Sequence, residues 1–395
     1  MTCSVKKLKN FTYHGHYFDL LYVILDENGS PPILPLLYTT YLCRFGEVFE
    51  LKVTAGTPHE CSTSILESRE VSDKTIRAYV YALSKFLSYL DLTKKSHSTQ
   101  GAHGSSACSD KFVNFYINTI LSQDLEAASS NEVHRASLSA YFNWLDYFAV
   151  KPRLELRTFR ITKQKLVENS KKENYIQYVT KYNRTKLINV CVMLSEKLMM
   201  RMGFEVGLRS SELTGLVVSG KGKLLELFEK LTDKKFLHHH EFSYFLEGKY
   251  TKGGVSRWIY FDRILLTDMK RYFDTERKSI VKKSKIYSDK FFLRRDRGNE
   301  GEGIGSEQAS RVFRKRSSQA GLNKLLHFHD LRHTFATELF HRETSQNGGR
   351  ENRSESAALI VVAQRLGHKF TKSGHAPAAT TRYIRAWLQM QELEA

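Results

Sequence analysis

The sequence predicts a mainly α-helical protein with a small β-sheet, and two patterns of apolar residues support this. Apolar residues recur at helical spacing in several stretches between residues 72 and 150. Two short alternating stretches, residues 241–246 and 257–261, flank a glycine-containing turn and predict a β-hairpin. The chain has 395 residues, enough for two or three domains at roughly 150 residues each. Its 41% hydrophobic and 26% charged residues are typical of a globular protein rather than a disordered or fibrous one.

Residues 1–65 predict a small appended module of unknown role. Tyr17 to Leu25 is apolar and aromatic enough to predict a strand, and Asp26 to Gly29 predicts a turn after it. The prolines from Pro31 to Pro35 predict a loop. We found no motif in this stretch that indicates a function.

A helical domain is predicted over residues 70–155. Ser72 is a suitable N-cap for its first helix. An apolar stripe follows at helical spacing, formed by Ile76, Val80, Leu83, Leu87 and Leu90. Further helices are predicted at residues 112–125 and 131–150, which together indicate a small helical bundle.

Three cations of the first helix, Lys74, Arg77 and Lys85, lie off its apolar stripe. The helix could therefore bury one face and present a cationic face to phosphates. An ordinary solvated face explains the same pattern equally well.

A polar, basic stretch of low periodicity, residues 156–184, predicts a linker, and a second domain follows over residues 185–395. Its first helix is predicted at Lys186 to Phe204, ahead of the hairpin. Later helices are predicted at residues 308–320, 330–341 and 357–366.

The charge of the chain predicts a polyanionic partner. The net charge is +19, of which residues 1–60 contribute −1 and residues 61–160 contribute +2, so about residues 161–395 carry +18. A concentrated positive charge on one domain favours phosphate neutralisation along nucleic acid over a solubility role.

Other classes of protein are disfavoured. The five cysteines are widely spaced without a CxxC pair, which predicts reduced thiols and neither disulfides nor zinc. Apolar runs fall far short of the roughly 18 to 20 residues that cross a bilayer. The basic start of the chain lacks the apolar segment of a secretion signal, so a cytoplasmic protein without a membrane partner is expected.

Four separated patches of the second domain carry candidate reactive side chains. Arg209 and Glu212 are three residues apart and would share a helix face, although an isolated surface ion pair is the simpler interpretation. Lys252 lies at the predicted hairpin tip, where a glycine-rich turn would let it reach a neighbouring groove; most such lysines face solvent. Lys249 is the fallback for the same role.

The third and fourth patches come from the C-terminal helices. His329 and Arg332 are three residues apart, so one helix aims an imidazole and a guanidinium at one point, a spacing that also occurs by chance. His368 follows Leu366 and Gly367, and Tyr383 comes shortly after it. A tyrosine in a basic context is a candidate nucleophile, whereas any single tyrosine is more often a half-buried aromatic.

Together the order of these residues resembles the tyrosine recombinase (phage integrase) family over about residues 70–395. Members carry an Arg in a GLRxxEL-like segment, a Lys on a β-hairpin, an HxxR helix, an LGH segment and then a Tyr, and all five are present here in that order. The resemblance implies a helical core DNA-binding domain followed by a mixed α/β catalytic domain. The combination is far more specific than any one motif.

The resemblance also implies a role for each residue. Arg209 and Arg332 would clamp the scissile phosphate, and His329 would donate a hydrogen bond to it. Lys252 would protonate the departing 5′ oxygen, and His368 would contact the phosphate or assist with the proton of the nucleophile. Two further residues complete the set: Tyr383, which would attack to form a 3′-phosphotyrosyl intermediate, and Glu212, which would orient Arg209 or a site histidine. Because each step exchanges one phosphodiester for another, neither ATP nor a metal cofactor is expected.

The implied function is site-specific recombination of double-stranded DNA, for integration or excision of a mobile element. Four strand cleavages imply a homotetramer on DNA, with possible accessory directionality proteins, in the bacterial cytoplasm or nucleoid. The chain departs from the family pattern in length, with predicted insertions at about residues 220–240, 344–356 and 369–379.

Three alternatives remain. A catalytically inactive DNA-binding regulator would keep the fold, although a decayed enzyme should lose at least one signature residue. A type IB topoisomerase shares the chemistry, but the HxxR and LGH segments favour a recombinase. A metal-dependent relaxase could use His238, His239 and His240, but three consecutive histidines cannot all face one ion.

Overall fold

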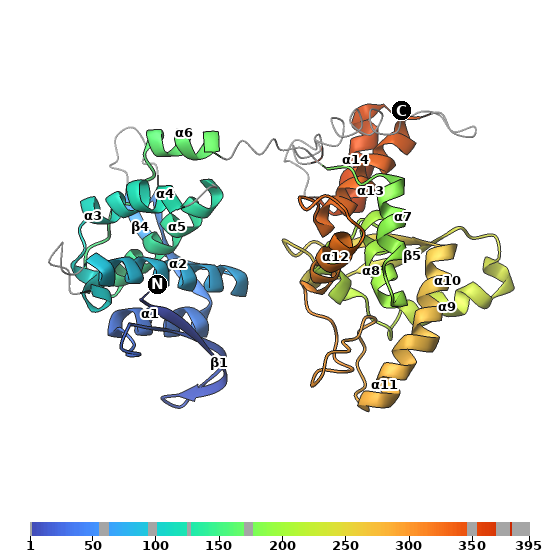
Figure 1. The fold of residues 1–395 in the computed structure, drawn as a ribbon, viewed down its shortest axis with the longest axis horizontal. Helices are drawn as coiled ribbons and strands as arrows, with labels where there is room; N and C mark the ends of the chain where they lie inside the picture. The colour runs from blue at the N-terminus through green and yellow to red at the C-terminus, as the bar shows by residue number, and fades with distance from the viewer. Residues whose placement is uncertain are drawn as a thin grey trace. The chain divides into compact units, whose positions relative to one another are not determined.

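The structure is a computed structural model that describes residues 2–54, 63–93, 101–124, 128–169, 177–345, 354–368 and 380. The chain forms two compact units, residues 1–173 and residues 174–395 (Figure 1). Within the described residues no helix is both long and apolar enough to pass through a bilayer.

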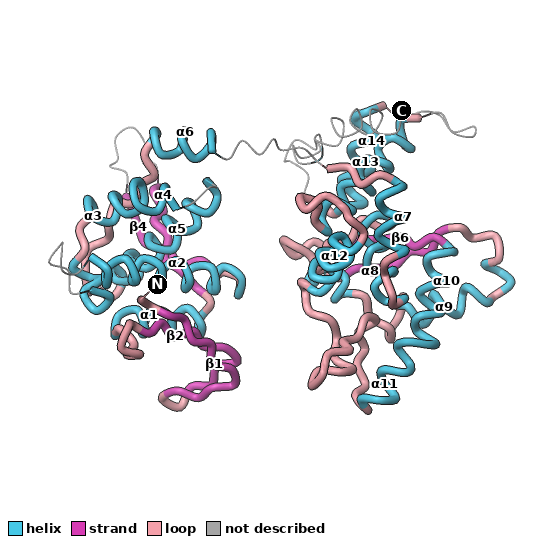
Figure 2. The backbone as a smooth tube through the Cα atoms, viewed as in Figure 1, coloured by secondary structure: helices cyan, strands magenta, loops and turns pink. Residues whose placement is uncertain are grey.

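The first unit begins with a long antiparallel hairpin. Strand β1 (Ser4–Tyr13) pairs with β2 (His16–Leu25) from Ser4 opposite Leu25 to Tyr13 opposite His16. The far end of the hairpin extends beyond the helices of its unit (Figure 2). The prediction of a strand at Tyr17 to Leu25 is confirmed; its partner β1 was missed because its lysines obscure the apolar alternation.

The prediction of a loop at Pro31 to Pro35 is wrong, because helix α1 (Ile33–Phe45) begins inside it. Pro32 is the N-cap and Pro35 lies in the first turn, where backbone N–H groups have no helical partner and a proline therefore removes nothing. The helix ends at Gly46, which adopts a left-handed φ of 65° and donates its N–H to Leu42. A second hairpin follows, β3 (Glu47–Thr54) with β4 (Thr63–Glu70).

The helical bundle is confirmed. Helix α2 (Asp73–Thr93) begins after Ser72, whose Oγ accepts a hydrogen bond from the Thr75 N–H at 3.3 Å. All five residues of its predicted stripe are buried. The other elements of the unit are η1 (Gly101–Ala107), α3 (Asp110–Phe115), the π-turn η2 (Tyr116–Ile120), α4 (Leu121–Asp124), α5 (Ala128–Tyr147) and α6 (Arg160–Asn169), the last within the stretch predicted as a linker.

The N-terminal module and the helical bundle share one hydrophobic core. The Tyr38 ring of α1 meets Tyr141 and Trp144 of α5 at centroid distances of 5.2 and 5.7 Å. Leu42 of α1 and Ile24 of β2 are buried in the same cluster as the stripe of α2. The described residues of the N-terminal module therefore fold against the helices and complete their core.

In the second unit, the single helix predicted over Lys186 to Phe204 is in fact two, α7 (Lys181–Asn189) and α8 (Leu194–Phe204). The break is stabilised by Glu196, whose carboxylate accepts hydrogen bonds from the backbone N–H groups of Val192 and Met193. The chain then forms η3 (Glu212–Gly215), α9 (Leu224–Thr232) and η4 (Lys234–Phe236). Helix α9 occupies the predicted insertion after Gly220 and buries Leu224, Leu227 and Phe228 in the core.

The predicted hairpin is confirmed as β5 (Glu241–Leu246) and β6 (Arg257–Asp262), paired from Glu241 opposite Asp262 to Leu246 opposite Arg257. Its tip includes the short turn η5 (Gly248–Tyr250). The remaining elements are α10 (Arg263–Tyr272), η6 (Phe273–Arg277), α11 (Lys278–Ser284), α12 (Gln308–Gln319), α13 (Phe328–Thr344) and α14 (Glu355–Leu366). Helix α13 packs on α8, α12 and α14, and the end of α14 meets β6.

Candidate active site

The loop between α8 and η3 presents Arg209. It turns at Gly207, which has a φ of 75° that favours glycine, and Leu208 anchors it in the core. A Cβ on Gly207 would lie 2.4 Å from the Phe335 ring of α13, so this position also requires close packing. The predicted helix start at Arg209 is only the 3-10 turn η3, yet Arg209 and Glu212 do face each other. The Arg209 backbone N–H and Nη1 donate to the Glu212 carboxylate at 2.8 and 2.7 Å.

Glu212 is completely buried and binds three arginines. Arg257, the first residue of β6, makes a two-pronged pair with Nη1 at 2.9 Å from Oε1 and Nη2 at 2.7 Å from Oε2. Nη1 of Arg332 lies 3.4 Å from Oε2. Burial alone would raise the pKa of Glu212, but the hydrogen bonds from Arg257 and the charges of the three arginines lower it to about 2. Glu212 is therefore a carboxylate at every physiological pH.

Arg332 of α13 links this helix to the Gly207 loop and to the end of α14. Its side chain is only 1% exposed, and its guanidinium donates to the Gly207 carbonyl at 2.5 Å and to the Leu366 carbonyl at 2.6 Å. Helix α13 thereby fixes both the loop that carries Arg209 and the end of α14. A long, multiply bonded guanidinium in the core holds a positive charge in a defined place.

His329 lies one turn before Arg332 on α13 and is exposed. Its ring meets His333 edge-on, with centroids 4.5 Å apart. Desolvation of the ring and the charges of Arg332 and Arg209 lower its pKa to about 4, with a smaller contribution of the same sign from Lys252. The imidazole is thus neutral at pH 7 and can donate one hydrogen bond.

His368 stands just past the end of α14. Gly367 ends the helix with a φ of 66°, and the His368 N–H bonds to the Ala363 carbonyl at 2.9 Å. The His368 Nδ1 lies 2.9 Å from Oγ1 of the buried Thr380. Desolvation, followed by the charges of Arg332 and Arg209, lowers the pKa of His368 to about 4. A second neutral imidazole therefore lies close to the arginines.

Lys252 is exposed in the hairpin tip, as predicted, and its charge reaches His329. The fallback residue, Lys249, forms an ion pair with Glu247 at 2.6 Å, and that hydrogen bond raises the pKa of Lys249. Of the two lysines, Lys252 is the one associated electrostatically with the arginine and histidine cluster.

The structure thus brings Arg209, Glu212, His329, Arg332 and His368 together, and Lys252 is near enough for its charge to lower the pKa of His329. Tyr383 lies outside the described residues. The cations of α2 belong to the other unit: Lys74 and Arg77 are exposed, whereas Lys85 forms an ion pair with Asp124 at 3.1 Å. Over the part of the chain that the structure describes, no three His, Cys, Asp or Glu side chains are grouped to hold a metal ion, and His238, His239 and His240 lie in an exposed loop.

Sequence reasoning missed Arg257 as part of this cluster. A signal was present: β6 alternates between buried and outward positions, and Arg257 occupies a buried one, in phase with Ile259 and Phe261. A charged residue at an inward strand position needs a buried partner, because an unpaired buried charge is very costly.

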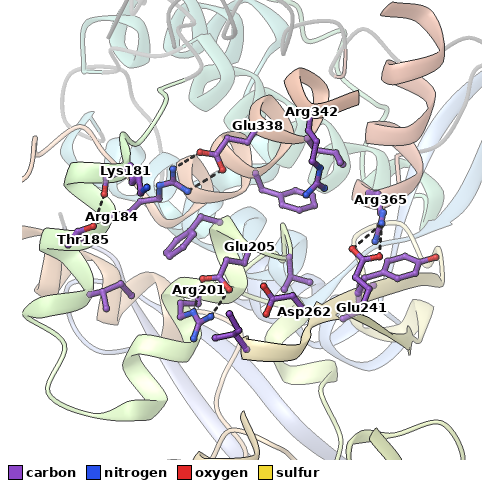
Figure 3. A pocket seen from close by; sticks show the side chains of 18 residues that line it. Lys181, Arg184, Thr185, Arg201, Glu205, Glu241, Asp262, Glu338, Arg342 and Arg365 are labelled. Carbon is purple, nitrogen blue, oxygen red and sulfur yellow. Dashed lines mark hydrogen bonds and ion pairs between the residues drawn. The ribbon is translucent and has the colours of Figure 1, made fainter. Parts of the chain in front are cut away.

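A cavity of about 800 Å³ lies elsewhere in the second unit, between α7, α8, β6 and α13 (Figure 3). Its rim carries the ion pairs Arg184–Glu338, Arg201–Glu205 and Arg365–Glu241. None of the described candidate residues lines it. Two residues link the cavity to the site: Phe335, which packs against Gly207, and Arg365, whose carbonyl accepts a hydrogen bond from Arg257. The candidate site is therefore the arginine cluster around Glu212 and not this cavity.

Comparison with known proteins decides the family. Residues 177–348 match the model of the phage integrase family, and these residues include the described cluster up to Arg332. Residues 177–348 therefore form a domain of the phage integrase family. The prediction of a tyrosine recombinase (phage integrase) family enzyme, made from the order of the motifs, is confirmed.

Two similar relatives extend the likeness beyond the family domain. The tyrosine recombinase XerD of Listeria monocytogenes, from two strains, is 24% identical over 307 residues, which cover 77% of this chain and 87% of the relative. The structure of the XerH site-specific recombinase bound to its difH substrate in a pre-cleavage complex has a TM-score of 0.52 at 15% identity. It covers 80% of this chain and 78% of that one. The predicted fold class, mainly α with small sheets, is confirmed.

Proposed function

We propose that this phage integrase family member cuts and rejoins double-stranded DNA at specific sites through a 3′-phosphotyrosyl intermediate on Tyr383. The observation that carries the proposal is the buried Glu212 carboxylate with three arginines around it, flanked by two neutral imidazoles and Lys252. Three positive charges on one carboxylate leave two uncompensated, which suits a phosphodiester and the further charge that develops when it is attacked.

In the proposed reaction Arg209 and Arg332 stabilise the non-bridging oxygens of the scissile phosphate, and His329 donates a hydrogen bond to them. The Tyr383 oxygen attacks phosphorus, and the bond from phosphorus to the 5′ oxygen breaks. Lys252 gives its proton to that oxygen as it leaves. His368 contacts the phosphate or helps to remove the proton of Tyr383, and Glu212 holds the arginines in position.

We further propose that four protomers act together, since exchanging two duplexes requires four cleavages. The biological event would be integration or excision of a mobile element in the bacterial cytoplasm or nucleoid, with accessory proteins setting its direction. Lys74 and Arg77, both exposed on α2, would contact DNA phosphates. Lys85 would join them only by giving up its pair with Asp124.

The decisive experiment compares the wild type with Tyr383→Phe on the DNA that flanks the gene. After rapid denaturation, protein joined covalently to DNA is recovered and the attached ends are sequenced. We expect adducts at 3′ ends with the wild type and none with the variant, because the variant lacks only the attacking oxygen.

Two other outcomes would contradict the proposal. Adducts that persist in Tyr383→Phe would assign the nucleophile to another residue. Tight duplex binding without adducts in either protein would favour the alternative of an inactive DNA-binding regulator.

A further inference from the structure

Arg257 is a buried arginine that the proposed reaction does not use. It is 6% exposed, and every polar atom of its guanidinium is engaged: Nη1 and Nη2 with Glu212, and Nε with the Arg365 carbonyl at 3.2 Å. A Cβ on Gly367 would lie 2.7 Å from its Cδ, so the end of α14 also packs on its aliphatic stem. The side chain touches two segments that carry candidate catalytic groups: the one with Glu212 and Arg209, and the end of α14, which His368 follows.

The hairpin tip that carries Lys252 begins and ends at fixed points. Arg257 is the first residue after the tip, five positions beyond Lys252. On the other side, the hydroxyl of Tyr250 accepts a hydrogen bond from Lys290 Nζ at 2.8 Å, and Lys290 also donates to the Thr214 carbonyl at 2.9 Å. A Cβ on Gly215 would lie 2.7 Å from the Tyr250 ring, so the tip rests directly on η3.

The tip itself is internally bonded. The Gly248 N–H donates to Ser256 Oγ at 2.8 Å, and the Thr251 hydroxyl bonds to the Gly248 and Val255 carbonyls at 2.9 and 2.8 Å. A Cβ on Gly248 would lie 2.2 Å from the Gly254 carbonyl oxygen, so the two limbs of the tip are in direct contact. Because of these contacts, the tip moves with its base as one rigid unit, whereas an open loop would move independently of it.

We propose that Arg257 is a positioning residue that sets the place of Lys252, the proton donor of the proposed reaction. By binding Glu212 and the end of α14, it fixes the base of β6 relative to Arg209 and His368. Loss of this anchor lets the tip shift while Arg209 and Arg332 keep their other contacts. A general acid must lie within hydrogen-bond reach of its acceptor, so a shift of the tip slows proton transfer specifically.

The inference rests on the proposed function and is tested by changing the leaving group. The probe is a duplex oligonucleotide bearing the site mapped from wild-type adducts, with either the natural 5′ oxygen or a 5′-bridging sulfur at the scissile phosphate. In the sulfur duplex the bond from phosphorus to sulfur breaks and a thiolate leaves. A thiol ionises at about pH 8.5, whereas water ionises at about 15.7, so the thiolate departs without a proton from Lys252.

We expect Arg257→Lys to slow single-turnover cleavage of the oxygen duplex by about 100-fold, as a misplacement of about 1 Å can. On the sulfur duplex, the cleavage rate of Arg257→Lys should lie within a few fold of the wild-type rate. Lys252→Ala should likewise be slow on the oxygen duplex and close to the wild type on the sulfur duplex. Arg209→Ala should stay slow on both duplexes, because the clamp is needed whichever atom leaves.

Arg316→Lys is the matched control. Arg316 is also a buried arginine of this unit, and it makes a two-pronged pair with Glu196 at 3.0 and 2.7 Å, remote from the Glu212 cluster in its contacts. The Arg316→Lys variant should cleave the sulfur and oxygen duplexes with nearly the same ratio of rates as the wild type.

The sulfur-to-oxygen rate ratio does not depend on how much of a variant is folded, because both duplexes meet the same active fraction. Arg257→Gln is a second variant that retains an amide donor toward Glu212. Equal slowing on both duplexes, or no cleavage of the sulfur duplex, in both Arg257 variants would overturn the inference. Failure of the wild type to form adducts would overturn the proposed function instead.

Discussion

At the scale of single residues, the site depends on Glu212. It neutralises one of three guanidinium charges and holds all three groups within a few ångströms of one another. Without it the arginines would repel, and a buried charge left without its partner typically costs about 3–5 kcal/mol. The carboxylate is thus what allows a concentrated positive charge to exist before a phosphate arrives.

The two histidines predict how stability depends on pH. Desolvation and neighbouring cations lower the pKa values of His329 and His368 from 6.5 to about 4, so the folded chain binds these protons more weakly than the unfolded chain. Stability should therefore fall as the pH drops from about 6.5 to about 4. We expect His368→Gln to show a shallower fall of the unfolding midpoint over this range, measured in urea at a series of pH values.

His134 of the first unit, whose pKa burial also lowers to about 4, contributes equally to the wild type and to His368→Gln. An unchanged slope in His368→Gln would show that the surroundings of this imidazole do not disfavour its protonation.

How far the sequence predicts the site is also decided residue by residue. Order and spacing pick out Arg209, Glu212, His329, Arg332 and His368, because each belongs to a short motif. Their convergence is not encoded in any periodicity, since it requires α13 to meet both the Gly207 loop and the end of α14. A residue such as Arg257, whose role comes only from that convergence, escapes motif reasoning.

At the scale of elements, the turn at Gly207 controls how closely α13 approaches the loop of Arg209. Gly207→Ala combines a left-handed backbone, which costs an L-residue roughly 1–2 kcal/mol, with overpacking against Phe335, typically about 1–3 kcal/mol. We expect a loss of about 2–5 kcal/mol in the free energy of unfolding, measured by denaturant titration.

Gly222→Ala separates the two causes. Gly222 has a similar φ of 68°, but nothing lies within 4 Å of a Cβ built on it. Its loss should be limited to the backbone cost of roughly 1–2 kcal/mol. An equal loss of unfolding free energy in the two variants would mean that the Phe335 ring moves aside without an energetic cost.

Elements with a clear period were predictable and others were not. The stripe of α2 and the alternation of β5 and β6 led directly to their structures. Helix α1 was missed because its prolines were assigned to a loop, although a first helical turn tolerates them. The break between α7 and α8 was missed because it depends on a side-chain cap from Glu196 and not on a proline or glycine.

At the scale of the whole molecule, the shared core predicts that the N-terminal module and the helical bundle unfold together. Tyr38 is completely buried against Tyr141 and Trp144, so Tyr38→Ala should cost about 3–5 kcal/mol, the range for large aromatic truncations. We expect faster hydrogen exchange in α2 and α5 as well as in α1, measured by mass spectrometry on the full chain.

The second unit is the internal reference for that experiment. Exchange in α13 should stay as in the wild type, because Tyr38 belongs to the other compact unit. Faster exchange confined to α1 and the first hairpin would instead mean that the module opens by itself.

The same core constrains how such a chain can diversify. Residues 1–65 could not be added or lost in evolution as an independent segment, because the aromatic face of α5 would then be exposed to water. Substitutions at Tyr38 or Leu42 must be matched by compensating changes in α2 and α5, so these segments are expected to be inherited as a block. A chimera that joins this N-terminal module to another recombinase would need its crossover after α5.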